Sequence, residues 1–145
     1  MEELWETDGK QDFDAMLLQA IADERQAIDF YGRLMQAAPN SFHREQINDP
    51  YQDEKKHNRW LTKLYEQREG HAPEVSYQRV VFSNYREGLR KAMDSELSAA
   101  EMYRTMLVMS HQMHEMRLVE LFYMIMTDEM IHATRFTYLR ATLRS

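Results

Sequence analysis

Apolar residues recur every three or four positions along four long stretches of this chain, whereas the two-residue alternation typical of strands is almost absent. The fourth stretch shows the pattern most cleanly, with an apolar stripe at Leu118, Phe122, Ile125, Phe136 and Leu139. We therefore expect an all-α protein with helices at about residues 11–37, 41–68, 85–110 and 114–143.

Three interruptions separate the predicted helices. Those at about residues 38–41 and 110–114 are short, so they predict two antiparallel helical hairpins. The interruption at about residues 69–84 is longer, and about 15 residues at roughly 3.3 Å each could span the length of a bundle. The expected fold is a four-helix bundle with two antiparallel hairpins and one long crossover. Pro50 is expected to kink the second helix or to delay its start.

The composition narrows the class of protein. With 145 residues the chain is expected to form one domain, residues 1–145. It contains no cysteine, which excludes disulfides, thiolate zinc sites and rubredoxin-type iron centres. A formal net charge of -6 disfavours a nucleic-acid surface. No signal peptide or transmembrane run is recognisable, so we expect a cytoplasmic protein with neither a membrane nor a nucleic acid as partner.

Six ionisable residues interrupt the apolar stripes where the pattern predicts the interior. One glutamate falls in the first stripe and one in the third, and a glutamate with a histidine falls in the second and in the fourth. These residues are Glu24, Glu96, Glu54, His57, Glu129 and His132. Four buried carboxylates would repel one another and become protonated unless cations neutralised them. Two divalent cations would balance four carboxylates, so the pattern predicts a two-metal site.

The spacing of these residues supports the prediction. A glutamate and a histidine three positions apart lie on one helix face and can reach one metal ion. Both Glu-x-x-His pairs follow an aspartate, Asp53 or Asp128. Each of the other two glutamates precedes a tyrosine by seven residues, Tyr31 or Tyr103, with an alanine between them that leaves room for metal.

The six residues are also expected to lie at one height. Glu24 and Glu54 flank the first predicted turn at about 15 residues each, and Glu96 and Glu129 flank the second at about 16 and 17. In antiparallel hairpins, equal distances from the turn place residues at equal heights. We therefore expect one layer of ligands in the middle of the bundle.

This arrangement resembles the ferritin-like di-iron carboxylate proteins, and within them the rubrerythrin branch, as a stand-alone domain. The resemblance covers about residues 13–143. It implies that Glu54 and Glu129 bridge two metals or approach both, whereas the other two glutamates and both histidines serve one metal each.

The same resemblance assigns roles to residues around the ligands. It implies that Asp53 and Asp128 accept hydrogen bonds from the histidines, and that Tyr31 and Tyr103 are redox neighbours of the metals. Two features differ from rubrerythrins. The chain lacks the cysteines of a rubredoxin-like centre, and it has Ala99 where rubrerythrins carry an extra carboxylate.

The leading functional hypothesis is a redox protein that binds two iron ions and reacts them with dioxygen or hydrogen peroxide, with an unknown electron donor. Manganese in a catalase-like enzyme, iron binding or storage without turnover, and a purely structural bundle are the alternatives. We also expect a homodimer, with Trp60, Met102, Met109 and Tyr123 contributing to an apolar flank. The acidic N-terminal segment with Trp5 is interpreted either as a packed arm or as a dimer contact.

Overall fold

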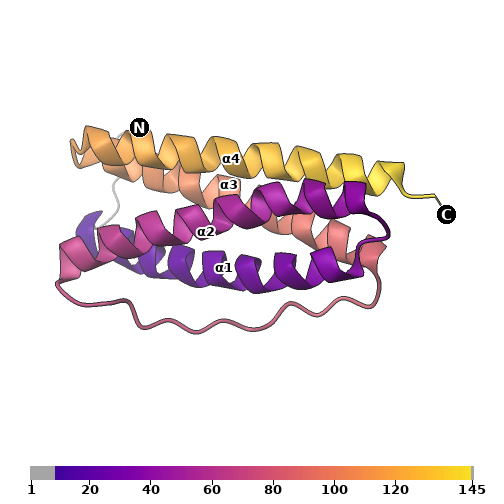
Figure 1. Ribbon diagram of the computed structural model, residues 1–145. Helices are drawn as coiled ribbons and strands as arrows, with labels where there is room; N and C mark the ends of the chain where they lie inside the picture. Colours follow the sequence, from indigo (N-terminus) through magenta and orange to yellow (C-terminus); the bar gives the residue numbers. More distant parts are fainter. Residues whose placement is uncertain (1–8, 145) are drawn as a thin grey trace.

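A computed structural model of the protein describes residues 9–144, and within this range it contains four helices and no strand (Figure 1). The predicted all-α four-helix bundle is confirmed, and each helix boundary lies within two residues of its predicted place. The helices are α1 (Gly9–Ala37), α2 (Ser41–Glu69), α3 (Tyr85–Gln112) and α4 (Met116–Thr142). None of the four is both long and apolar enough to span a lipid bilayer.

Asparagine side chains fix the starts of α2 and α3. The Oδ1 atom of Asn40 accepts a hydrogen bond from the backbone N–H of His43 at 2.9 Å. Asn84 accepts one from the backbone N–H of Glu87 at the same distance. Each bond satisfies one of the amide groups that have no partner in the first turn of a helix.

Backbone conformation explains the remaining boundaries. α2 ends at Glu69 because the next residue, Gly70, has a φ of 81°, a left-handed conformation that glycine adopts without steric cost. α4 begins at Met116, two residues later than predicted, because His114 has a φ of 59° and cannot belong to a right-handed helix. α2 begins at Ser41 and continues through Pro50, so the expected delay of its start is wrong. The ring of Pro50 is buried, and this burial offsets part of the cost of the missing backbone hydrogen bond.

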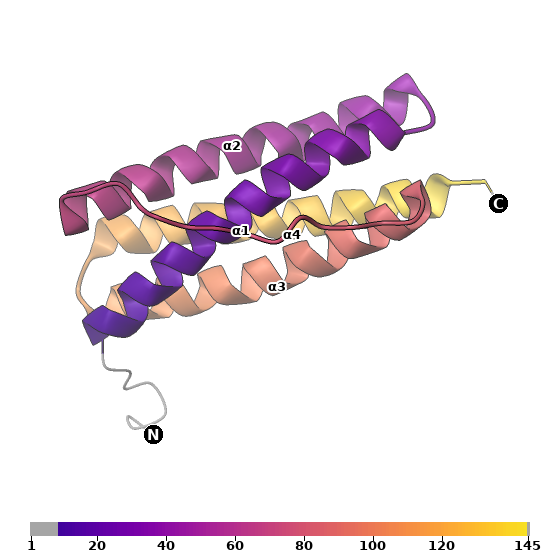
Figure 2. The same cartoon turned by 90° about the horizontal axis from the view of Figure 1, so that it is seen from below.

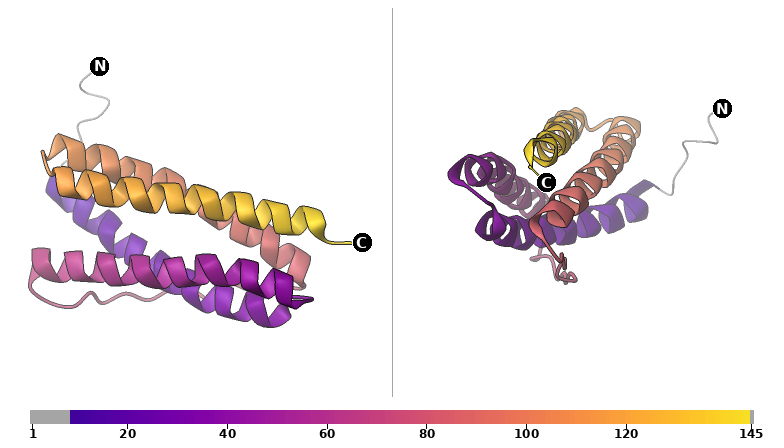
Figure 3. Two further views of the ribbon diagram at one scale, coloured as in Figure 1. Left: turned by 45° about the horizontal axis from the view of Figure 1, so that its top comes forward. Right: turned by 90° about the vertical axis from the view of Figure 1, so that its right-hand side faces the viewer.

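The four helices form two antiparallel hairpins, α1–α2 and α3–α4, joined by a crossover at residues 70–84 that runs along the bundle (Figures 1 and 2). α1 lies beside α3 and α2 lies beside α4, and across the bundle α1 contacts α4 through side chains such as Tyr31 and Phe136, whose ring centroids lie 5.0 Å apart. The crossover carries the chain back to the end of the bundle where α2 begins, so α3 runs in the same direction as α2 and neighbouring helices are antiparallel throughout (Figure 3). This is the predicted ferritin-like arrangement.

The crossover is tied to the α1–α3 side of the bundle. The Nε2 atom of Gln26 donates a hydrogen bond to the backbone carbonyl of Gln78 at 2.6 Å. Near α3, a Cβ atom on Gly88 would lie 2.6 Å from Cδ1 of Leu34 and 3.2 Å from the ring of Phe82. Glycine at this position therefore lets α3, α1 and the crossover approach closely.

The apolar core consists of two clusters with a polar layer between them. Toward the end of the bundle where α1 begins lie Phe13, Leu17, Ala20, Ile21, Leu61, Tyr65, Tyr103, Met106, Met109, Leu118, Phe122 and Ile125. Toward the other end lie Phe30, Tyr31, Leu34, Ala38, Ile47, Leu89, Ala92, Phe136 and Leu139. On every helix the candidate ligands fall between the two clusters, as the heights measured from the turns predicted.

The residues expected to form an apolar dimer flank do not share one exposed surface. Met109 is 3% exposed and belongs to the core, so its assignment to a flank is wrong. Trp60 and Met102 are partly buried against the same cluster, and Tyr123 alone is largely exposed. The α3 position of Met109 turns inward because it lies three residues after Met106, on the same helix face. The segment that contains Trp5 lies outside the described residues.

Candidate metal centre

All four helices contribute side chains to one buried layer. α1 and α3 each provide a glutamate, and α2 and α4 each provide a glutamate and a histidine. None of these side chains is more than 2% exposed: Glu24, Glu54, His57, Glu96, Glu129 and His132. The structure thus brings together every residue that the sequence predicted as a metal ligand.

The layer divides into two groups that share two members. One group contains Glu24 and His57, the other contains Glu96 and His132, and both include Glu54 and Glu129. Within each group, one potential ligand atom per residue lies within 4.8 Å of the others. Two neighbouring cations could share these two carboxylates, because each carboxylate has two oxygens.

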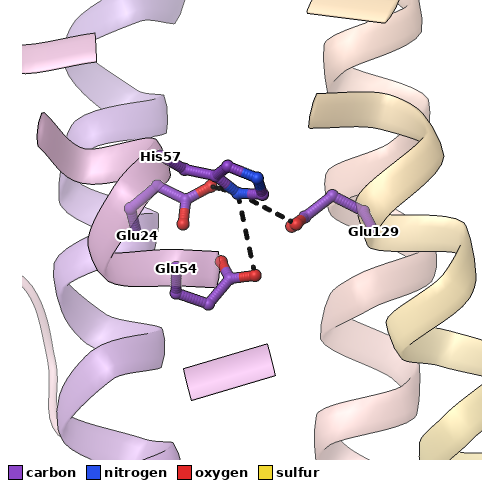
Figure 4. A group of neighbouring side chains, drawn as sticks. All are labelled: Glu24, Glu54, His57 and Glu129. Carbon is purple, nitrogen blue, oxygen red and sulfur yellow. Dashed lines mark ion pairs between the residues drawn. The ribbon is translucent and has the colours of Figure 1, made fainter. Parts of the chain in front are cut away.

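The first group surrounds the Nδ1 atom of His57 (Figure 4). This nitrogen lies 3.6 Å from Oε1 of Glu24, 3.8 Å from Oε1 of Glu54 and 3.3 Å from Oε1 of Glu129. The three glutamates come from α1, α2 and α4, so the imidazole nitrogen faces carboxylates from three helices.

The second group surrounds the Nδ1 atom of His132 in the same manner. It lies 3.0 Å from Oε1 of Glu54, 3.4 Å from Oε1 of Glu96 and 3.4 Å from Oε1 of Glu129. The rings of His57 and His132 are stacked, with their centroids 6.3 Å apart. The two halves of the layer are therefore related by an approximate two-fold symmetry.

An aspartate on the opposite helix holds each histidine. The Nε2 atom of His57 lies 2.8 Å from Oδ2 of Asp128, and Nε2 of His132 lies 2.8 Å from Oδ2 of Asp53. A carboxylate accepts hydrogen bonds, so Nε2 carries the hydrogen and the Nδ1 atoms face the glutamates. The Nζ atom of Lys56 lies 3.3 Å from Oδ1 of Asp53 and 4.0 Å from Oδ2 of Asp128, so Lys56 forms ion pairs with both aspartates.

Two buried tyrosines hold the glutamates that belong to one group each. The hydroxyl of Tyr103 donates a hydrogen bond to Oε1 of Glu24 at 2.5 Å. The hydroxyl of Tyr31 donates to Oε1 of Glu96. The tyrosine of α3 thus bonds the glutamate of α1, and the tyrosine of α1 bonds the glutamate of α3. The sequence did not indicate this exchange between the two helices.

The electrostatics show how strongly the carboxylates interact in this layer. Burial, followed by repulsion from neighbouring glutamates, raises the pKa of Glu54 and the pKa of Glu96. Burial also opposes ionisation of Glu129, but the imidazoles of His132 and His57 beside it lower its pKa overall. The layer therefore lacks enough cationic partners for four ionised glutamates.

Both histidines respond to the surrounding carboxylates. Burial opposes protonation, but Asp128, Glu129 and Glu24 raise the pKa of His57 to about 12. Burial opposes protonation of His132 as well, whereas Glu129 and Glu96 raise its pKa to about 10. The protonated imidazoles thus supply positive charge among these carboxylates.

The buried atoms without a hydrogen-bond partner test whether the residues fit metal ions. Within the described residues there are seven such side-chain atoms, and six of them belong to the candidate ligands: Glu24 Oε2, Glu54 Oε1, His57 Nδ1, Glu96 Oε2, Glu129 Oε1 and His132 Nδ1. A buried polar atom without a partner costs stability. One such atom on each of six converging ligands fits two cations that the oxygens and nitrogens would coordinate.

A cavity of about 480 Å³ reaches the layer from the α1–α3 side. Ala27, Ala99, Phe30 and Met102 line its apolar part, and it extends to the glutamates and both tyrosines. The small side chains of Ala27 and Ala99 leave this space next to the tyrosines, as their matching positions in the sequence suggested. The histidines come from α2 and α4 and do not line this cavity. A small molecule in the cavity would therefore approach the glutamates from the side opposite the histidines.

Comparison with solved structures identifies the fold. The chain superposes with a TM-score of 0.82 on a ferritin-like, diiron-carboxylate protein from Bacillus anthracis, at 19% identity over 93% of this chain and 99% of that one. A hypothetical protein from Pyrococcus furiosus gives a TM-score of 0.74 at 25% identity, covering 92% of each chain. A bacterioferritin from Desulfovibrio desulfuricans, whose diiron site was studied, gives 0.75 at 17% identity over 92% of this chain and 81% of that one.

Comparison with curated protein sequences gave no match. The sequence does match a protein family over residues 15–140, a range that includes all six candidate ligands, both aspartates and both tyrosines. The match, the four-helix fold and the Glu/His layer agree with one another. This chain belongs to the rubrerythrin family.

Proposed function

We propose that this protein binds two iron(II) ions in the mid-bundle layer and oxidises them with hydrogen peroxide or dioxygen. The observation that carries the proposal is the set of six buried, unpartnered ligand atoms, which form two groups sharing Glu54 and Glu129. Glu24 and His57 would complete one iron site, and Glu96 and His132 the other.

The ligand chemistry favours iron or manganese. Carboxylate oxygens with one imidazole nitrogen per metal suit these ions better than soft metals that prefer thiolates. Four glutamates carry four negative charges when ionised, so two divalent ions would make the layer neutral without other counter-ions. The neutral layer also explains why such acidic residues are tolerated between two apolar clusters.

Two iron(II) ions together would supply the two electrons that, with two protons from solvent, reduce one hydrogen peroxide to two waters. The surrounding residues prepare the layer for this reaction. Asp128 and Asp53 orient the imidazoles, and Tyr103 and Tyr31 hold the glutamates that serve a single metal. Burial, with the neighbouring carboxylates, raises the pKa of both tyrosines, so their hydroxyls stay protonated and remain hydrogen-bond donors.

The cavity on the α1–α3 side provides access for a small oxidant. Its volume of about 480 Å³ exceeds the roughly 30 Å³ that a water molecule occupies in the liquid, so peroxide or dioxygen could enter with solvent. The apolar clusters close the layer toward both ends of the bundle. These 145 residues contain no cysteine, so electrons for repeated turnover would come from a separate donor.

Anaerobic titration of the metal-free protein with iron(II) tests the proposal. We expect two ions to bind per chain, and we expect hydrogen peroxide or dioxygen to produce visible absorption bands of iron(III) in stopped-flow experiments. Glu54→Gln removes a shared ligand and should abolish the binding of at least one ion. Glu101→Gln, at an exposed position on α3, is the matched control and should bind two.

The same titration with manganese(II), followed by measurement of oxygen release from peroxide, tests the catalase-like alternative. Tight binding of manganese together with oxygen evolution, and no reaction of the iron-loaded protein, would replace the iron proposal. Failure to bind either metal would exclude both functions.

A further inference from the structure

The cavity on the α1–α3 side connects the solvent to the buried glutamates. Ser95 and Ser98 line it and are exposed, and Asp23 lines it and is half-buried, whereas the glutamates that line it are at most 2% exposed. We call Asp23, Ser95 and Ser98 the cavity mouth. Asp23 directly precedes Glu24, and Ser95 directly precedes Glu96. The mouth therefore lies at the height of the metal centre and next to two of its ligands.

The side chains around the cavity carry one sign of charge. Of the lining residues in the described part of the chain, six are acidic and none is basic: Asp23, Glu24, Glu54, Asp94, Glu96 and Glu129. Asp94 is balanced by Arg90, whose Nη1 atom lies 3.0 Å from its Oδ2 atom. Asp23 instead accepts a hydrogen bond at Oδ1 from the neutral amide of Gln19, at 2.8 Å. Asp23 thus places a negative charge at the opening of a cavity with partly apolar walls, an arrangement that concentrates cations.

Two unpartnered ligand atoms belong to residues at the inner end of the same cavity. Glu24 and Glu96 line it, and each uses Oε1 to accept a hydrogen bond from a tyrosine. The Oε2 atom of each is buried and has no hydrogen-bond partner. Both side chains are at most 2% exposed. A cation that comes through the cavity therefore reaches free carboxylate oxygens before it reaches the histidines.

The other approaches to the metal centre are less suited to a cation. On the α2–α4 side, Lys56 forms ion pairs with the two aspartates that hold the histidines, so a positive charge stands there. On the α1–α2 side, Arg25 donates hydrogen bonds to Asn58 at 3.1 Å and to Thr62 at 3.3 Å. α3 packs closely against α4, and apolar clusters fill the bundle toward both ends. Charge and packing thus favour the α1–α3 side.

We propose that the cavity mouth is the entry site for divalent cations, with Asp23 as the residue that attracts them. The carboxylate of Asp23 and the hydroxyls of the two serines offer oxygens that replace part of the hydration shell of the ion. The ion then passes to Oε2 of Glu24, on the adjacent residue. Asp23 belongs to neither group of ligands, so it controls how fast the ions bind and not how many. The inference rests on the proposed metal site but not on its reaction with an oxidant.

Stopped-flow absorption with cobalt(II) and the metal-free full chain tests the entry site. Cobalt(II) bound by carboxylates and imidazoles absorbs visible light, so its binding is followed without any oxidant. Asp23→Asn should lower the association rate constant about tenfold at low ionic strength, while two ions still bind at saturation. Asp12→Asn removes the same charge from an exposed position on α1 and should bind at the wild-type rate.

A second pair of variants separates charge from structural disturbance. Ser98→Lys adds a cation at the mouth and should slow association about tenfold, whereas Ser98→Gln adds a neutral side chain and should slow it less than twofold. Raising the ionic strength from about 10 mM to about 150 mM should slow the wild type more than Asp23→Asn, because salt screens the attraction. A change that only disturbed the fold would not depend on the sign of the charge or on salt.

The outcomes distinguish this inference from the proposed function. Equal association rates for the wild type, Asp23→Asn and Ser98→Lys would overturn the entry site and leave the metal centre intact. Faster association in Lys56→Gln, with those rates equal, would place the route on the α2–α4 side. A wild type that binds no cobalt(II) would overturn both the entry site and the metal centre. Normal cobalt(II) results with no oxidation of bound iron(II) would contradict the proposed function alone.

Discussion

The Nε2 atom of His57 lies 2.8 Å from Oδ2 of Asp128, the residue that immediately precedes Glu129. The same relationship links His132 to Asp53, which precedes Glu54. Each Asp-Glu-x-x-His segment therefore provides two ligands and also orients the histidine of the other segment. This exchange couples α2 to α4 across the metal centre.

We expect Asp128→Ala to weaken metal binding in the group that contains His57, by about 10- to 100-fold. Without the carboxylate the imidazole loses the partner that fixes its orientation and tautomer. Anaerobic titration with iron(II) should show one tight and one weakened site. Asp94→Ala, at an exposed position on α3, is the control. Equal weakening of both sites would contradict an effect confined to the group of His57.

Tyr103→Phe should leave Glu24 without its hydrogen bond while keeping the shape of the core. Because Glu24 is buried, the loss should lower the free energy of unfolding of the metal-free protein by about 1–3 kcal/mol, as measured with urea. Tyr123→Phe removes an exposed hydroxyl and should change stability by less than about 0.5 kcal/mol. An unchanged free energy of unfolding for Tyr103→Phe would show that this hydroxyl contributes little to stability.

The ligand layer could be predicted from sequence because its residues violate the pattern around them. Glu96 stands between Ala92 and Tyr103 in an apolar stripe, and such an exception is visible without a structure. The heights followed from the same pattern, because the two short turns fix the register of each hairpin. The apolar stripes do not show which residues of different helices contact one another.

The features that the sequence did not reveal depend on contacts between distant residues. His43 gave no signal, yet it is buried, with Nδ1 2.7 Å from the hydroxyl of Tyr85 and Nε2 3.3 Å from that of Thr142. Met109 was expected on an exposed flank, but it lies three residues after Met106, on the buried face of α3. Pro50 was expected to kink α2 or to delay its start, but α2 begins at Ser41, because tertiary packing overrides the local preference.

Metal binding should release protons. The neighbouring carboxylates raise the pKa of His57 to about 12 and that of His132 to about 10, so both imidazoles are protonated at pH 7 in the metal-free protein. A metal ion must displace the proton on Nδ1, so at least two protons should leave per chain and the affinity should rise with pH. Calorimetric titration in two buffers of different ionisation enthalpy measures this number. Binding without proton release would contradict the prediction.

Ala99→Leu should narrow the cavity on the α1–α3 side. The larger side chain would occupy space beside the tyrosines, so oxidation of bound iron(II) by peroxide should slow severalfold in stopped-flow experiments while two ions still bind. Glu101→Leu places the same side chain on the exposed side of α3 and is the control. An unchanged rate for Ala99→Leu would show that the oxidant reaches the ligands by another route.

His43 should make the stability of the fold depend on pH. Burial lowers its pKa below the ordinary 6.5, so protonation favours the unfolded chain. The stability that neutral His43 contributes is present above pH 6.5 and is lost as the pH falls below that value. His57 and His132 act in the opposite direction, because their pKa values of about 12 and about 10 in the folded chain lie above 6.5, so their contribution declines as the pH rises above 6.5. The wild type and His43→Asn share that contribution, so it cancels in their difference. In urea unfolding of the metal-free protein between pH 5 and 7.5, the stability of the wild type relative to His43→Asn should therefore fall as the pH falls. His71→Asn, at an exposed position, should follow the wild type, and parallel curves for all three proteins would rule out His43 as the source.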